Sequence, residues 1–119
     1  MAESIKSIID WHEQTFPDAT LDGQMDKFQQ ELKEFAATLE PDADYNHLLE
    51  ELADMYIVAC GVARFSIERA LSCFTVVNAF KDLYRLCSFE LEEMVDKKMA
   101  INRQRKWSIG KGNYQHVGE

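Results

Sequence analysis

Apolar residues recur every three to four positions along most of the chain, the spacing that places them on one face of an α-helix. Pro17, Pro41 and short polar stretches interrupt this pattern and mark ends of helices. The pattern predicts five helical segments, at residues 3–15, 21–39, 45–65, 67–86 and 89–106.

The segment from Tyr45 to Phe65 is apolar on most sides, so we expect it to be the central helix. Ser66 and Ser88 are candidate N-caps of the last two segments, which are also compatible with one long helix. The Gly-rich stretch after Trp107 shows no strand pattern and predicts a loop. The sequence therefore predicts an all-α bundle of four to five helices, with a helical domain at residues 1–107 and a C-terminal loop or tail at 108–119.

The composition fits one domain of 119 residues, of which 46% are apolar. The net charge of −8 argues against binding duplex nucleic acid through the overall field, although divalent metals allow local phosphate binding. The N-terminus lacks the pattern of a secretory signal, and no apolar run is long enough for a membrane span, so we expect a cytoplasmic protein. The three cysteines lie in apolar helical patterns and are expected to be buried thiols.

Four carboxylates form two pairs with i,i+3 spacing, Glu31 with Glu34 and Glu51 with Asp54. This spacing places the members of a pair about 60° apart on a helix. Two such pairs on facing helices would surround one cavity with oxygen ligands of the kind that Mg²⁺ prefers. The alternative for the first pair is a set of surface ion pairs with Lys27 and Lys33.

Asp54 is not expected to be solvated, because the helix face on which it lies turns apolar beyond it. Burying an unpaired carboxylate is costly, and a metal or a basic partner removes that cost. Glu50 lies on the same face, and it is either a residue behind the metal ligands or a charge that suits the start of the helix.

Lys98, Asn102 and Arg105 share one face of the last helix at i, i+4 and i+7. Beside a metal site, two cations and an amide would bind a polyphosphate. The alternative is a positive last turn that suits the helix dipole.

The stretches "GQMDKFQQELKEF", "EELADMY" and "KKMAINRQRKW" resemble the all-α nucleoside triphosphate pyrophosphohydrolases of the MazG-like superfamily. With "GNYQHV", the chain is most similar to small phage and bacterial members that hydrolyse deoxynucleoside triphosphates. Two features depart from the family pattern: Gln30 stands where many members carry a Glu, and the segment around Arg64 to Leu86 looks like an added helix.

The resemblance implies hydrolysis of (deoxy)nucleoside triphosphates, with a lean towards purine dNTPs, to a nucleoside monophosphate and pyrophosphate by a homo-oligomer, dimer or tetramer. It implies Mg²⁺, with Mn²⁺ as a substitute, held by Glu31, Glu34, Glu51 and Asp54. It also implies Glu34 as general base and Lys98 and Arg105 as catalytic cations. A nucleobase would lie against Phe28, Trp11 or Trp107, although packing in the core is the favoured alternative for these three side chains. The implied substrate-binding residues are Gln24, Lys27, Lys98, Asn102 and Arg105.

Two other functions remain open from the residues alone. The first is a non-catalytic helical interaction module in which the acids form a solvated face. The second is a carboxylate-bridged di-iron bundle, which the sequence disfavours because no histidine follows a glutamate by three positions.

Overall fold

The computed structural model describes residues 2–40, 42–110 and 113–117, and five helices make up most of this part of the chain. They are α1 (Ile5–Thr15), α2 (Leu21–Ala37), α3 (Tyr45–Ala63), α4 (Ile67–Leu83) and α5 (Ser88–Asn102). The predicted all-helical domain is confirmed to within a few residues at each helix end.

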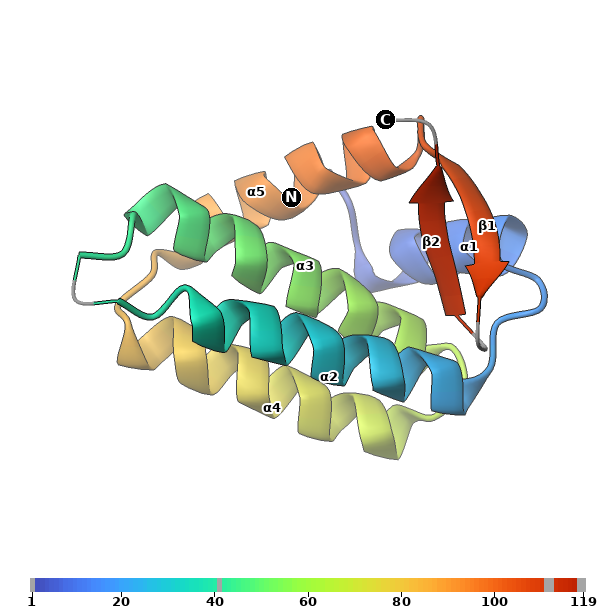
Figure 1. Cartoon of the computed structure of the whole chain (residues 1–119), viewed down its shortest axis with the longest axis horizontal. Coiled ribbons are helices and arrows are strands. Elements are labelled where there is room, and N and C mark those ends of the chain that lie inside the picture. The colour runs from blue at the N-terminus through green and yellow to red at the C-terminus, as the bar shows by residue number, and fades with distance from the viewer. Residues whose placement is uncertain (1, 41, 111–112, 118–119) are drawn as a thin grey trace.

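Helix α3 is the centre of the bundle, as its apolar sequence predicts, and it contacts each of the other four helices. Figure 1 shows α2 and α4 along one side of α3 and α5 along the other. Leu52, Met55 and Cys60 of α3 are fully buried, which explains why an amphipathic pattern is weak in this helix.

The break between α4 and α5 rules out one long helix, the alternative that the sequence left open. Arg85 adopts a left-handed conformation with φ of 56°, which ends α4 and turns the chain. Ser66 caps α4 as predicted, because its side chain accepts a hydrogen bond from the Arg69 amide. The cap predicted for Ser88 is wrong: Cys87 occupies the N-cap position of α5, and the Ser88 hydroxyl accepts a hydrogen bond from Lys81 at 2.8 Å.

The C-terminal segment differs from the expected loop. Strands β1 (Lys106–Gly110) and β2 (Asn113–Val117) pair antiparallel, with Lys106 opposite Val117 and Gly110 opposite Asn113. Two five-residue strands are too short to give a clear alternating pattern, and the glycines in this segment are typical of a loop. The remaining residues of this segment, 111, 112, 118 and 119, lie outside the described residues.

The expectation of three buried cysteines holds for Cys60 and Cys73 and is wrong for Cys87, which is exposed at the α4–α5 turn. No helix among the described residues has the length and apolarity that crossing a membrane requires.

Candidate metal and phosphate site

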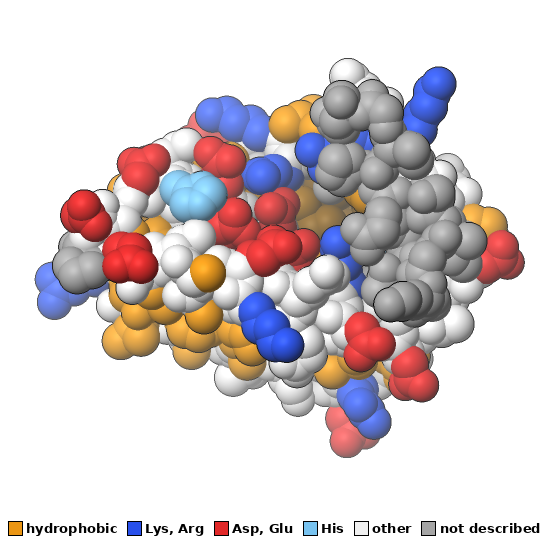
Figure 2. Space-filling model, in the orientation of Figure 1, with side chains coloured by type: hydrophobic (Ala, Val, Ile, Leu, Met, Phe, Trp, Pro, Cys, Tyr) orange, Lys and Arg blue, Asp and Glu red, His pale blue; other side chains and the backbone are white. Residues whose placement is uncertain are grey.

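Three of the predicted carboxylates converge where α2 faces α3. Oxygen atoms of Glu31, Glu51 and Asp54 lie within 4.8 Å of one another. Glu31 comes from α2 and the other two from α3, so the antiparallel packing of these helices creates the cluster. Figure 2 shows acidic side chains gathered in the middle of this face, with basic side chains beside them and a hollow next to them.

Burial makes this cluster electrostatically costly when all three groups are charged. Glu31 is only 8% exposed, and burial, aided by the nearby charges of Asp54 and Glu34, raises its pKa to about 8. Burial also raises the pKa of Glu51 and that of Asp54, with neighbouring carboxylates adding to both shifts. Three like charges in one place therefore call for protons or for a cation.

Two buried oxygens of the cluster have no hydrogen-bond partner in the part of the chain that the structure describes and could bind a divalent cation. Glu31 Oε2 and Glu51 Oε2 are buried and have no hydrogen-bond partner among the described residues. Oxygens on opposite sides of one Mg²⁺ are about 4.2 Å apart, so small side-chain rotations would bring this cluster onto an ion. Glu31, Glu51 and Asp54 thus have the donor type and spacing to hold a cation, and Glu31 and Glu51 also have unmet hydrogen-bonding capacity.

Glu34 lies at the edge of this cluster. It is exposed, and its charge acts on Glu31, Glu51 and Asp54. Glu34, which was predicted as a fourth metal ligand, is not in the tight group of three.

Two lysines reach the cluster from opposite sides. Lys98 Nζ of α5 is 3.3 Å from Asp54 Oδ2 and 3.8 Å from Glu50 Oε2. Lys27 Nζ is 3.7 Å from Glu31 Oε1, which is one of the ion pairs considered as the alternative to a metal site. Glu50 is not part of the group of three and instead pairs with Lys98 and accepts a hydrogen bond from Asn46.

A cavity of about 350 Å³ opens beside the carboxylates. All of the predicted site residues except Glu51 line it: Gln24, Lys27, Glu31, Glu34, Asp54, Lys98, Asn102 and Arg105. Residues far apart in the sequence therefore share one cavity because α2, α3 and α5 surround it.

The other end of the cavity is aromatic. Trp11, Phe16 and Trp107 line it and pack edge to face, with ring centroids 5.1–6.2 Å apart. Trp107 Nε1 donates to the Asn102 carbonyl at 3.3 Å, which ties this wall to the end of α5. Phe28, a candidate contact for the nucleobase, is buried in the core and does not line the cavity.

Sequence reasoning missed His12 and Arg64. His12 is buried and lines the cavity, and Arg64 donates to its ring. The two residues are 52 positions apart, so no local spacing could have linked them.

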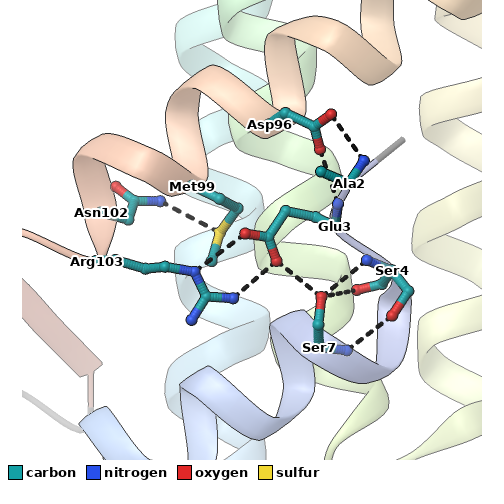
Figure 3. A network of polar contacts seen from close by, with 8 residues as sticks. All are labelled: Ala2, Glu3, Ser4, Ser7, Asp96, Met99, Asn102 and Arg103. Carbon is teal, nitrogen blue, oxygen red and sulfur yellow. Dashed lines mark hydrogen bonds and ion pairs between the residues drawn. The ribbon is translucent and has the colours of Figure 1, made fainter.

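The N-terminus ties α1 to α5, the two helices that carry the aromatic wall and the cationic strip. The amides of Ala2 and Glu3 donate to the Asp96 carboxylate, each at 3.0 Å, and Arg103 holds Glu3 through two nitrogens at 2.7 and 3.0 Å. Figure 3 shows this network around the first turn of α1. The Arg103 bond is the main reason that the pKa of Glu3 lies below its ordinary value.

We expect Arg103→Met to lower the free energy of unfolding by about 1 kcal/mol at pH 7, because a bidentate pair on a partly exposed arginine is partly screened. The pair stabilises the fold where Glu3 is charged, so the difference should narrow as the pH falls below about 4. Urea denaturation of Arg103→Met beside the exposed control Arg69→Met measures both effects. A deficit of the same size at pH 7 and pH 2.5 would contradict this account.

A search of protein-family models, curated proteins and solved structures finds no match for this chain.

Proposed function

We propose that the protein is a Mg²⁺-dependent pyrophosphohydrolase of nucleoside triphosphates, in keeping with its resemblance to the MazG-like superfamily. The observation that carries this proposal is a group of three converging carboxylates, two of them bearing orphaned buried oxygens, beside a cavity that Lys98 and Arg105 line. A solvated acidic face is a poorer account, because Glu31 is only 8% exposed and burying a carboxylate without a ligand is costly. The di-iron alternative lacks a histidine in the group of three.

In the proposed reaction, water attacks the α- or β-phosphorus, and the bond between phosphorus and the α–β bridging oxygen breaks. Bound Mg²⁺ would neutralise the phosphates and make water more acidic. Glu34 takes the proton of the attacking water, since it is the exposed carboxylate that lines the cavity. The products are a nucleoside monophosphate and pyrophosphate.

The two cations proposed to bind phosphate are Lys98 of α5 and Arg105, which follows the end of α5 and does not continue its helical face as predicted. Lys98 pairs with Asp54 in this structure, and with a cation held by Asp54 its ammonium group would be available to bind phosphate oxygens. Arg105 lies next to Asn102, with Nη1 3.5 Å from Asn102 Oδ1, and both line the cavity. The aromatic end of Trp11, Phe16 and Trp107 offers flat surfaces for a base.

The proposal is tested with purified protein, Mg²⁺ and the eight common NTPs and dNTPs, each measured for pyrophosphate release. We expect release from at least one dNTP, with purine dNTPs favoured through the resemblance of the C-terminal segment. EDTA should stop the reaction, and Mn²⁺ should restore it. Release from none of the eight would end the proposal.

We also propose that the protein is cytoplasmic and acts as a homo-oligomer. Ile67 and Leu71 of α4 are 65% and 61% exposed, which is unusual for such large apolar side chains on neighbouring turns. A solution mass equal to that of a single chain, measured by light scattering, would reject this assembly.

A further inference from the structure

Two buried polar side chains lie in the wall of the cavity, away from the carboxylates. His12 of α1 and Gln24 of α2 are each 5% exposed, and both line the cavity. Gln24 is two helical turns before Glu31, about 10 Å along α2. Because buried polar groups are costly without partners, the partners of these two residues decide which atoms face the cavity.

Arg64 fixes the tautomer of His12. Its Nη1 lies 3.0 Å from His12 Nδ1 and also donates to the Phe16 carbonyl at 2.8 Å. A guanidinium only donates hydrogen bonds, so Nδ1 must accept, and the ring proton must be on Nε2. Burial, together with the charge of Arg64, lowers the pKa of His12 to about 4, so the ring is neutral at pH 7.

His12 in turn fixes the amide of Gln24, to which it is hydrogen bonded. Since Nε2–H is a donor, its partner must be the amide oxygen, Gln24 Oε1. Gly61 of α3 gives these atoms their space: a Cβ there would lie 2.7 Å from Gln24 Oε1 and 3.0 Å from His12 Nε2. The oxygen of the amide is therefore turned towards His12 and Gly61.

With Gln24 Oε1 turned towards His12, the amide nitrogen Nε2 faces the cavity. Within the described part of the chain, Gln24 Nε2 has no hydrogen-bond acceptor, and the side chain lines the cavity. A side chain that is nine-tenths buried and keeps two N–H donors unpaired is prepared for a ligand that accepts hydrogen bonds.

We propose that Arg64, acting through the neutral ring of His12, holds the Gln24 amide with its NH₂ group towards the cavity, so that this part of the site selects a ligand group that accepts a hydrogen bond. A carbonyl oxygen or an unprotonated ring nitrogen of a nucleobase has this chemistry. The assignment to a nucleobase rests on the proposed function, whereas the orientation of the three side chains does not. Gln24 contacts the ligand, and His12 and Arg64 are positioning residues.

The kinetic test uses Mg²⁺ and the preferred dNTP, with Arg64→Met, Gln24→Glu and their double variant. Each single variant should raise KM about tenfold, the loss expected for one misplaced buried hydrogen bond, and leave kcat within about twofold. The double variant should be no worse than Gln24→Glu, because both changes remove the same contact. The matched control Arg69→Met, on an exposed residue, should keep the KM of the wild type.

An unchanged KM in folded Arg64→Met, or effects that add in the double variant, would overturn the proposal. If Arg64→Met does not fold, Gly61→Ala serves instead, since its methyl group displaces the Gln24 oxygen while Arg64 stays in place. It should raise KM with little change in kcat, and a wild-type KM would again overturn the proposal.

Nitrogen NMR of the histidine rings tests the orientation without any substrate. At pH 7, His12 should be neutral with its proton on Nε2, and Arg64→Met should abolish this preference. A proton on Nδ1, or a charged ring, would overturn the inference whether or not the protein hydrolyses nucleotides. Correct NMR signals without hydrolysis of any nucleotide would reject the proposed function and the nucleobase assignment, while supporting the orientation of the side chains.

Discussion

Glu51→Gln should lower the rate of pyrophosphate release by roughly 10²–10³-fold or more and leave the helical content unchanged, because it removes a charge from the proposed metal site. Glu51 is suited to this test because it belongs to the group of three carboxylates yet does not line the cavity. The substitution therefore alters the metal site while sparing the surfaces that would hold the nucleotide. The measurements are kcat at saturating Mg²⁺ and the circular dichroism spectrum.

The same variant should be more stable than the wild type when no metal is present. Glu51 Oε2 is buried without a hydrogen-bond partner in the described chain, and burial together with the charges of Asp54 and Glu34 raises the pKa of Glu51, so a neutral amide relieves both costs. We expect a melting temperature a few degrees higher at pH 8 in EDTA. Loss of activity with a gain of stability is the signature of a site that is strained for its function.

Glu50→Gln is the matched control, since Glu50 is the preceding residue on the same helix and lies outside the group of three. It should keep kcat within about threefold, because it removes only a partly exposed pair with Lys98. Full activity in Glu51→Gln, or equal losses in the two variants, would contradict the assignment of the metal site.

The metal-free protein should lose stability as the pH rises from about 5 to about 9, and Mg²⁺ should restore it. Glu31 is the main cause, because burial raises its folded-state pKa from 4.5 to about 8. A group with a raised pKa holds its proton more tightly in the folded state, so its favourable contribution is complete below pH 4.5 and is lost as the pH passes 8. Glu51 and Asp54, whose pKa values are also raised by burial, act in the same direction.

The expected loss is about 4 kcal/mol, which is on the order of 10 °C in melting temperature, in a scan of unfolding against pH in EDTA. With Mg²⁺ in excess, the curve should be flatter, since a bound cation takes the place of the protons. Glu31→Gln should flatten the EDTA curve without any metal. A wild-type curve that rises between pH 5 and 9 in EDTA, or that Mg²⁺ leaves unchanged, would show that the carboxylates are not a coupled cation site.

The helices could be read from the sequence because each is set by local spacing. The apolar face of α2 and the uniformly apolar α3 appear directly in the order of residues, and the Ser66 cap depends on an amide only three residues away. The predictions that were wrong concern positions with weak local signals: the cap at Ser88, the burial of Cys87 and the strands after Arg105.

The candidate site was predictable in part, since spacing within one helix defines a face. Glu31 and Glu34 share a face of α2, and Lys98 and Asn102 share a face of α5, so each half of the site is visible in the sequence. The sequence left the role of Glu50 open, and its pairing with Lys98 and Asn46 separates it from the three converging carboxylates.

The sequence by itself determined the helices, the acidic face of α3 and the candidate ligands, because these depend on periodicity within single segments. Only the tertiary structure decided that Glu31, Glu51 and Asp54 meet, that burial raises their pKa values, and that Arg64 reaches His12 across 52 positions. The physical reason is that desolvation and contacts between helices depend on which faces pack together, and many packings satisfy the same local pattern.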